Sequence, residues 1–487
     1  MTLASSTLRR AGLLGICAAL LVLATASPAG AAPVGVAPAG AGGSVTAWTN
    51  HNDDGQTTVP SSLASKTVTA IAAGGTHGLA LTSDGKVTAW GRNNAGQSTV
   101  PSSLASKTVT AIAAGANHSL ALTSDGKVTS WGDPQAPVPS SLDGKTITAI
   151  AAGGGALSLG HSLALTSDGK VTAWGTNWYG EGTVPSTLDG EIVTAISAGD
   201  SHNLALTDGK VIAWGGNGNG QTTVPSSLNG KTVTAIAAGS FSNLALTSDG
   251  KVTAWGYAAD FAPVPTSLNG KTVTAIAAGF EQNLALTSDG KVTAWGAQPD
   301  DGDTIVPSSL NGKTVTAIAA GAYVSVAIVG YVAPKITTQP VSHTAAAGHE
   351  VTFTAAATGY PTPTVAWQVS ADAGKTYKPI AGATKASLTV TGTTATDGNR
   401  YQAVFTNLKG TATADAASLT LPATSGGTTS AGGSSAPAAP AAGGGTSLPN
   451  TGASVATPLI AALVLIGAGG ALTIAATRRR TRTARHR

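Results

Sequence analysis

Cysteine is almost absent from this sequence of 487 residues, because the one that occurs, Cys17, lies in an apolar run near the N-terminus. That run, residues 11–26, follows two arginines and precedes small residues. This pattern predicts a secretory signal peptide over residues 1–31, with cleavage after Ala26 or Ala31. The mature chain would have no thiol, which excludes disulfides, thiol chemistry and metal sites with cysteine ligands.

Positive charge is also scarce once the two ends are set aside. The formal net charge is +4, but two arginines belong to the expected signal peptide and six to the C-terminal tail. Neither segment contains an acidic residue, so removing these eight charges leaves −4 for residues 27–451. A chain of this sign lacks the positive field that phosphate backbones require, and nucleic acid is not an expected partner.

A second long apolar run, residues 453–477, lies near the C-terminus. At about 1.5 Å of rise per residue it is long enough to cross a bilayer as a transmembrane helix. The six arginines of residues 478–487 predict a cytoplasmic tail. A Gly/Ser/Ala/Pro segment over residues 422–447 has no aromatic side chain and predicts a disordered stalk.

The pentapeptide LPNTG stands between the stalk and the apolar run. Pentapeptide, apolar span and basic tail in this order resemble the sorting signal of Gram-positive surface proteins. All five positions match the motif: Leu448, Pro449, Asn450, Thr451 and Gly452. The resemblance implies that a sortase cuts after Thr451 and joins its carboxyl group to peptidoglycan, so that the membrane span belongs to the precursor alone. The alternative is a plain membrane anchor.

Between these ends the chain repeats itself. Seven tryptophans recur every 40–43 residues, at Trp48, Trp90, Trp131, Trp174, Trp214, Trp255 and Trp295. One repeat reads KTVTAIAAG, a variable patch, LALTSDGKVTAWG, a second variable patch and TVPSSL. Short runs of Val, Ile, Thr and Ala between Gly and Pro predict strands, and the many alanines suit strands that are buried on both faces. A period near 40 with several strands per unit predicts a propeller or an array.

The first and last repeats are incomplete halves, GSVTAW at residues 43–48 and TVTAIAAGAYVSVAIVG at residues 314–330. Together they make one unit. Pairing of the first strand with the last repeat would close a ring and hide its free edges. We therefore expect an all-β chain with a seven-bladed β-propeller over residues 43–332.

Phrases such as HSLALTSDGKVTSWG resemble the repeats of the regulator of chromosome condensation family, which implies a seven-bladed propeller. In repeat length, and in AWGGNGNGQTTVP and VTAIAAG, the chain is most similar to short-repeat bacterial β-lactamase inhibitor proteins of the same fold. That resemblance implies inhibition of a β-lactamase or a related penicillin-recognising enzyme through two aromatic-rich series of loops. The first three loops after AAG lack aromatic residues here, so the inhibitory function stays open.

Residues 334–421 break the period and resemble a bacterial immunoglobulin-like domain. Trp367 matches the buried tryptophan of that β-sandwich, and Tyr401 matches the tyrosine-corner position. Ala355 and Ala403 stand where the family's disulfide pair would be, so this domain is expected to depend on packing of its interior.

Two polar residue types recur in the repeats. An aspartate precedes glycine between strands at Asp84, Asp125, Asp168, Asp208, Asp249 and Asp289, which predicts type I′ hairpin turns. One carboxylate per blade cannot converge on a calcium ion. A histidine occupies one repeat position at His77, His118, His161 and His202, and we expect hydrogen bonds between blades there instead of a zinc site.

The sequence offers no Ser-His-Asp set and no acid pair that can be placed across a cleft. We therefore expect neither an enzyme nor a cofactor or metal, with a propeller lyase or glycosidase as the remaining alternative.

The two variable patches are the expected functional surface. The strand order places the loop after AAG and the loop after WG on one rim, opposite the Ser-Asp-Gly turns. Loops on a rigid scaffold commonly carry function, and aromatic residues dominate binding surfaces. The expected binding residues are Trp178, Tyr179, Phe241, Tyr257, Phe261, Phe280, Glu281 and Tyr323. We expect a monomer that binds an extracellular protein or a wall component without catalysis.

Overall fold

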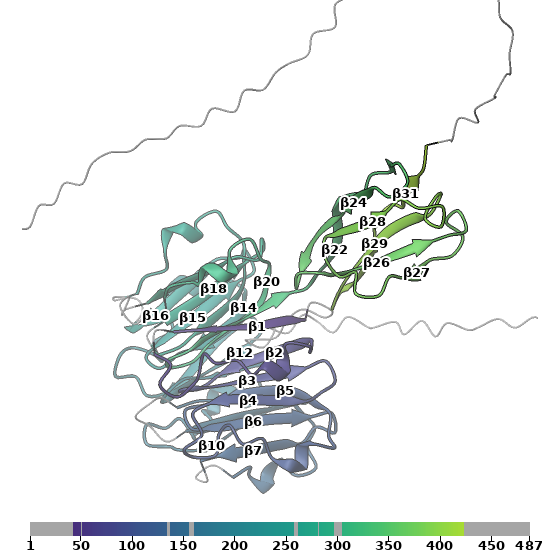
Figure 1. Cartoon of the computed structure of the whole chain (residues 1–487). Coiled ribbons are helices and arrows are strands. Elements are labelled where there is room, and N and C mark those ends of the chain that lie inside the picture. Colours follow the sequence, from purple (N-terminus) through teal and green to yellow (C-terminus); the bar gives the residue numbers. More distant parts are fainter. Residues whose placement is uncertain are drawn as a thin grey trace, which may run out of the picture. The chain divides into compact units, whose positions relative to one another are not determined.

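The computed structural model describes residues 42–49, 51–133, 137–154, 160–257, 262–280, 282–296 and 304–422. The expected signal peptide, sorting motif, transmembrane helix and basic tail lie outside these ranges, as does the expected stalk apart from its first residue. Within the described ranges, no helix has the length and apolar character needed to span a bilayer. Strands and short 3-10 helices make up an all-β architecture (Figure 1).

The propeller is built from one repeated unit of three antiparallel strands, called inner, middle and outer here. The complete units are β2 (Val68–Ala73), β3 (His77–Thr82) and β4 (Val87–Gly91); β5 (Val109–Ala114), β6 (His118–Thr123) and β7 (Val128–Gly132); β8 (Ile147–Ala152), β9 (His161–Thr166) and β10 (Val171–Gly175); β11 (Val193–Ala198), β12 (His202–Thr207) and β13 (Lys210–Gly215); β14 (Val233–Ala238), β15 (Ser242–Thr247) and β16 (Val252–Gly256); and β17 (Val273–Ala278), β18 (Gln282–Thr287) and β19 (Val292–Gly296).

A 3-10 helix precedes each inner strand and buries its last residue, a leucine. These helices are η1 (Ser61–Leu63), η2 (Ser102–Leu104), η3 (Ser140–Leu142), η4 (Ser186–Leu188), η5 (Ser226–Leu228), η6 (Thr266–Leu268) and η8 (Ser308–Leu310). The proline before each helix cannot donate a backbone hydrogen bond, and its fixed φ suits the first turn. The motif TVPSSL therefore leads the chain from one outer strand to the next inner strand and buries a leucine on the way.

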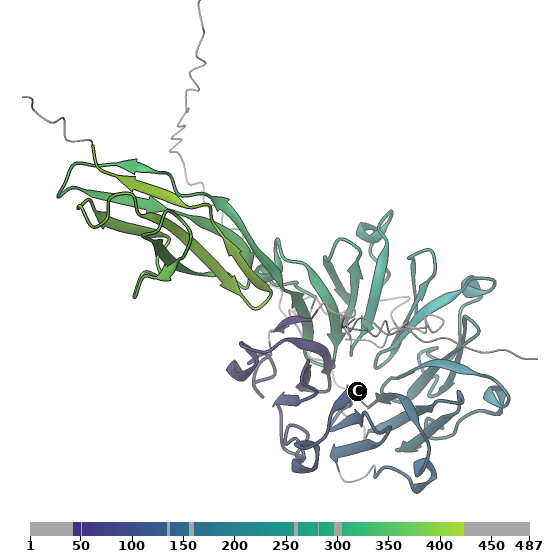
Figure 2. The ribbon, with the colours of Figure 1, turned by 90° about the vertical axis from the view of Figure 1, so that its right-hand side faces the viewer.

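The ring closes as the two half repeats predict. β20 (Val315–Ala320) and β21 (Ser325–Gly330) come from the last repeat, and β1 (Gly43–Trp48) pairs with β21 along its whole length, from Gly43 opposite Gly330 to Trp48 opposite Ser325. Each inner strand contacts the next inner strand, and β20 contacts β2. Figure 2 shows the propeller sheets arranged in a ring.

Backbone hydrogen bonds link neighbouring units around the same ring. Gly75 N donates to Gly115 O at 3.0 Å, and the equivalent bond recurs at each junction. The last of them runs from Ala322 N to Gly74 O at 3.0 Å and returns to the first unit. Six of these seven bonds join residues about one repeat apart, and the seventh joins the two ends of the repeat array, so the ring is held by non-local contacts.

Packing between sheets follows the alternation of large and small residues in the middle strand. Leu79 and Leu81 of β3 pack against Ala121 and Trp131 of the next unit. Ala80, on the other face of β3, packs beside residues of the preceding unit, in a cluster that includes Ile328. The middle strands are buried at every position, which confirms the predicted burial of both faces for them. The prediction is wrong for the outer strands, such as β4, and for inner strands such as β5, most of whose positions are half-buried. A leucine buried in this way contributes roughly 2 kcal/mol.

The prediction of a type I′ turn at every Asp-Gly pair is wrong for all copies but one. A type I′ turn, with positive φ at both central residues, occurs only in the copy that lacks the serine, where Asp208 has φ 46° and Gly209 has φ 71°. In the other copies the glycine alone has positive φ, as at Gly85 (φ 74°), whose N–H donates to Thr82 O at 2.8 Å. The additional serine makes a longer loop, which takes a type I turn followed by a left-handed glycine.

The immunoglobulin-like domain comprises β22 (Val332–Thr338), β23 (His343–Thr344), β24 (Glu350–Thr354), β25 (Ala356–Tyr360), β26 (Thr364–Ser370), β27 (Lys378–Pro379), β28 (Ser387–Thr391), β29 (Arg400–Asn407), β30 (Gly410–Thr413) and β31 (Ala417–Thr420). One sheet has the order β23-β31-β29-β26-β27, with β30 paired to β29, and β24 pairs with β28. Trp367, Tyr401, Ala355 and Ala403 are all buried in one apolar cluster, which confirms their predicted interior positions. Tyr401 stacks on Phe353 with ring centroids 4.9 Å apart.

Candidate binding rim

The propeller has two rims, and the structure confirms which loops share each of them. His77, at the start of β3, pairs with Gly91, at the end of β4. Arg92 N also donates to Thr76 O at 2.9 Å, so the loop after the inner strand lies beside the loop after the outer strand. We call the rim formed by these two series of loops the variable rim. The opposite rim, formed by the Asp-Gly turns, is the turn rim.

Trp178 and Tyr179 are the most prominent aromatic residues of the variable rim. Their exposed fractions are 67% and 62%, in the loop that follows β10. Glu181 fixes the backbone of this loop. The residue is only 2% exposed, and its carboxylate accepts hydrogen bonds from Trp178 N (3.2 Å) and Tyr179 N (2.7 Å). Asn177 Oδ1 accepts another from Gly182 N at 2.8 Å. The two aromatic rings are therefore presented to solvent on a fixed backbone.

The same loop is anchored to the next unit. Glu181 O accepts hydrogen bonds from Asn203 Nδ2 (2.8 Å) and Trp214 Nε1 (3.2 Å). Gln97 and Gln221 act in the same way in other units, since their backbone carbonyls accept from Trp131 and Trp255. This anchor was missed at the sequence level, although the pattern Gln/Glu-x-Thr-Val-Pro marks it.

A second group of predicted residues comes together on the loops after β14, β17 and β20. The Phe241 and Phe280 rings are 5.5 Å apart, and the Phe280 and Tyr323 rings are 5.7 Å apart. Tyr257 N donates to Phe241 O at 2.9 Å, which places it in the same region. His51, which sequence reasoning did not select, extends the series with its ring 6.5 Å from Tyr323. We call Phe241, Phe280, Tyr323 and His51 the aromatic row.

The predicted binding residues therefore fall into two groups. Trp178 and Tyr179 stand on one loop, and the aromatic row with Tyr257 crosses three later units. No ring contact between the two groups occurs among the described residues. Phe261 and Glu281 lie outside the described residues.

The four repeated histidines bond across unit boundaries, as predicted. His77 and His118 Nε2 lie 2.9 Å from Ser119 and Ser162 Oγ of the next unit. His161 and His202 Nε2 lie 2.7 Å from Asn203 and Asn243 Oδ1. Because Asn203 Nδ2 donates to Glu181 O, its Oδ1 must accept, and the proton of His161 is on Nε2.

Burial keeps these histidines neutral. Burial, and to a smaller extent the nearby His118, lower the pKa of His77 to about 3. Burial also lowers the pKa of His118 to about 4 and that of His202 to about 4, and the pKa of His161 shifts in the same direction for the same reason. Each ring also packs on a glycine: a Cβ on Gly115 would lie 2.4 Å from His118 Cε1.

The aspartates of the turn rim stabilise turns. Thr82 Oγ1 donates to Asp84, and Lys66 Nζ lies 3.1 Å from its carboxylate. The Thr82 hydroxyl and then Lys66 lower the pKa of Asp84 to about 2. Within the described parts of the chain, no group of three or more His, Cys, Asp or Glu is arranged to hold a metal ion.

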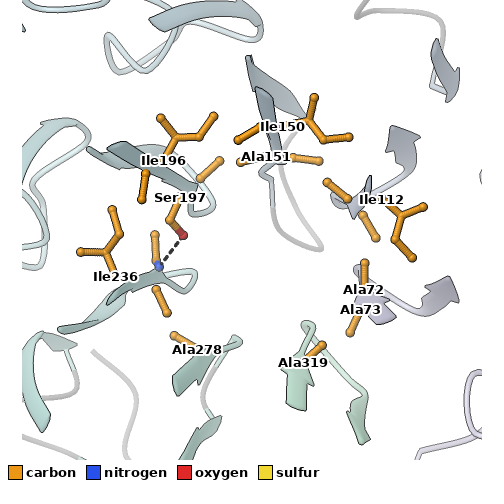
Figure 3. A pocket seen from close by; sticks show the side chains of 18 of the residues that line it. Ala72, Ala73, Ile112, Ile150, Ala151, Ile196, Ser197, Ile236, Ala278 and Ala319 are labelled. Carbon is orange, nitrogen blue, oxygen red and sulfur yellow. Dashed lines mark hydrogen bonds between the residues drawn. The ribbon is translucent and has the colours of Figure 1, made fainter. Parts of the chain in front are cut away.

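A channel of about 170 Å³ runs between the inner strands. Its wall consists of Ile and Ala from successive units, with Thr194 and Ser197 as the polar members. Figure 3 shows these strands around the channel and the hydrogen bond from Ala238 N to Ser197 Oγ, which is 2.9 Å long. Asp200 lines the mouth of the channel at the variable rim. The described wall offers no pair of acids for glycoside chemistry.

Comparison with known proteins identifies both folded regions. Four segments match the family model for the regulator of chromosome condensation (RCC1) repeat: residues 68–97, 109–135, 193–221 and 233–259. Residues 333–407 match an immunoglobulin domain. The chain therefore contains RCC1 repeats and an immunoglobulin-like domain.

Solved structures support the same fold. The propeller protein Prp20p of Saccharomyces cerevisiae, described with its binding to Gsp1p and histones, is 20% identical with a TM-score of 0.50, covering 61% of this chain and 93% of that one. Yeast RCC1 (Prp20) bound to Kap60 is 19% identical with a TM-score of 0.51, covering 67% and 96%. At this identity the likeness concerns the fold alone.

A curated relative, Endoglucanase C of Cellulomonas fimi, is 52% identical over 89 residues. That stretch is 18% of this chain and 8% of the relative, so the chain spans less than a tenth of the enzyme's length.

Proposed function

We propose that this is a cell-wall-anchored surface protein whose propeller binds an extracellular protein or a wall component through the variable rim, without catalysis. We count the six-stranded sheet β20-β21-β1-β2-β3-β4 as two blades, since β1 and β2 share the single pair Gly43–Val68, which gives seven blades in all. The observation that carries the binding role is the pair of solvent-exposed rings, Trp178 and Tyr179, on a loop that Glu181 holds in place.

Exposed aromatic rings on a fixed backbone are well suited to binding. Large rings bury much apolar area, and a loop that is already ordered loses little conformational entropy when a partner binds. The described wall of the channel is made of Ile and Ala with Thr194 and Ser197, and Asp200 stands alone at its mouth, which leaves the exposed rings of the variable rim as the feature on which the binding role rests. The two rims also differ in sequence. The turn rim repeats nearly the same turn in each unit, whereas the loops of the variable rim differ from unit to unit, as expected of a binding surface.

The test replaces Trp178, Tyr179 and Tyr257 together by Ala and measures pull-down of partners from the extracellular fraction. We expect loss of the specific partner, with the melting temperature of the propeller unchanged to within a few degrees. The matched control replaces Lys86, Lys127 and Lys170 of the turn rim by Ala. Equal capture by the aromatic variant and the wild type would refute the assignment of the binding rim.

Anchoring to the wall rests on the order of LPNTG, apolar run and basic tail in the sequence. The proposed partner for this step is a sortase, which would cut the chain after Thr451. Thr451→Ala should move the protein from the peptidoglycan fraction to the membrane or the medium, measured by lysozyme release and immunoblotting. Wall linkage that persists in this variant would overturn the proposal.

Inhibition of a β-lactamase is the second candidate function. The aromatic row favours it, because the resembling inhibitors contact their target through aromatic residues on this same series of loops. The purified chain should then slow hydrolysis of a chromogenic β-lactam by at least one enzyme of a panel. An unchanged rate across the panel would eliminate this candidate.

A further inference from the structure

Charge is divided between the two rims of the propeller. Every lysine of residues 42–332 lies either shortly before an inner strand or directly after an Asp-Gly turn, and both positions are on the turn rim: Lys66, Lys86, Lys107, Lys127, Lys145, Lys170, Lys210, Lys231, Lys251, Lys271, Lys291 and Lys313. Ion pairs such as Lys107–Asp125 (3.1 Å) and Lys291–Asp289 (3.3 Å) confirm this position.

The variable rim has the opposite sign. Its described loops carry Asp53, Asp54, Asp133 and Asp200 at exposed or half-exposed positions, against Arg92 as their basic residue. Five further acids lie outside the described residues: Asp260, Glu281, Asp300, Asp301 and Asp303. The rim that presents the aromatic rings is therefore the acidic rim.

Acidic groups stand near both ends of the aromatic row. At one end, Asp53 and Asp54 belong to the same loop as His51, whose ring contacts Tyr323. This loop is ordered by Asn52 Oδ1, which accepts from Thr57 N at 2.8 Å, and both aspartates are exposed. At the other end, Asp200 N donates to Gly239 O at 3.3 Å, two residues before Phe241.

We propose that the variable rim docks a lysine- or arginine-rich segment of an extracellular protein. This inference rests on the proposed binding function and names the chemistry of its partner. Aromatic faces attract ammonium and guanidinium groups, and the adjacent carboxylates add complementary charge. The same charge repels anionic wall polymers, and the lysines of the turn rim repel a cationic segment from the opposite face.

The test uses the purified full-length chain and two fluorescent peptides of equal length, one rich in Lys and Trp and the other with Glu in place of each Lys. Fluorescence anisotropy should show binding of the lysine peptide alone. Its affinity should fall about fivefold or more as the ionic strength is raised from roughly 0.05 to 0.5 M. Asp53→Asn with Asp54→Asn should weaken binding by about fivefold, the effect of two exposed ion pairs.

Matched controls separate the rim from general electrostatics. Asp125→Asn with Asp289→Asn removes the same charge from the turn rim and should leave the affinity unchanged. Trp178→Ala with Tyr179→Ala should weaken binding by about tenfold. Equal binding of both peptides, or an equal loss in the turn-rim control, would overturn the inference.

The failure of this inference and the failure of the proposed function have different signatures. If the Trp178, Tyr179 and Tyr257 variant loses a natural partner that is a neutral glycan or an acidic protein, the binding rim stands and the cationic partner is refuted. If that variant keeps its natural partner, the binding rim itself is refuted.

Discussion

Acid should unfold the propeller at a higher pH than its carboxylates alone would require. His77, His118 and His202 are buried, and burial lowers their pKa values to about 3, about 4 and about 4. In the unfolded chain each should titrate near its ordinary pKa of about 6.5. Between these values the unfolded state binds protons that the folded state does not, so the free energy of unfolding rises with pH from about 4 to about 6.5.

The size of this effect follows from the shifts. Each histidine contributes about 1.4 kcal/mol per pH unit in that window, and hence about 2 kcal/mol between pH 6.5 and pH 5. Three histidines together lower the free energy of unfolding by about 6 kcal/mol at pH 5, which is comparable to the whole stability of an ordinary domain. The aspartates of the turn rim contribute little there, because the pKa of Asp84 is lowered to about 2 and its titration lies below pH 4.

The measurement is urea unfolding between pH 4.5 and pH 8, followed by tryptophan fluorescence. Eight of the nine tryptophans lie in the propeller, so the signal reports mainly on this domain. The chain supplies its own control, because Gln282 occupies the histidine position in another unit and donates to Gly321 O at 2.9 Å. His118→Gln should reduce the slope of stability against pH by about 1.4 kcal/mol per unit.

A fall of less than about 1 kcal/mol between pH 6.5 and pH 5 would refute the reasoning, since even one of these shifts predicts more. An unchanged slope in His118→Gln would show that this ring is not the titrating group. Loss of all acid sensitivity in the variant with His77, His118, His161 and His202 replaced by Gln would support the account fully.

Two further predictions concern stability. Gly115→Ala should lower the free energy of unfolding by about 2 kcal/mol or more, because the new Cβ would lie 2.4 Å from His118 Cε1 and 2.6 Å from Gly153 O. The control is Gly218→Ala, whose new Cβ meets no atom within 4 Å. It should lower the free energy of unfolding by less than about 0.5 kcal/mol in the same urea titration. Trp131→Phe should cost about 1–2 kcal/mol, since it removes the 2.9 Å hydrogen bond from Trp131 Nε1 to Gln97 O, which keeps only the 3.0 Å bond from Ser119 Oγ. Trp178→Phe at the exposed rim should be neutral, and equal effects of the two substitutions would contradict the anchoring role of the repeated tryptophan.

Sequence patterns predicted the elements that depend on local alternation and on the period. The strand motifs and the closure by β1 follow from the repeat and its two halves, whereas the predicted burial on both faces holds for the LALT strand and not for the outer strands or for inner strands such as β5. The interior of the immunoglobulin-like domain was predicted as well, with Trp367 and Tyr401 buried together.

The partners in contacts that join different repeats could not be predicted in the same way. The sequence predicts that the histidines bond between blades, but His118 and Ser162 are 44 residues apart, and neither sequence neighbourhood indicates the other as the partner. Glu181 lies in a loop that varies between repeats, and nothing in the sequence indicates that its carboxylate accepts hydrogen bonds from the backbone of that loop. The Asp-Gly turns differ in type for a local reason. The copy without the serine has a two-residue hairpin loop, and the serine in the other copies lengthens the loop.

The most direct test of the central claim is site-specific photocrosslinking in the extracellular fraction. A benzophenone amino acid replaces Tyr179 on the variable rim or Ser83 on the turn rim, and adducts are detected by a shift on an immunoblot. The account predicts an adduct from position 179 and none from position 83. An adduct from position 83 alone would place the partner on the wrong rim and contradict the account.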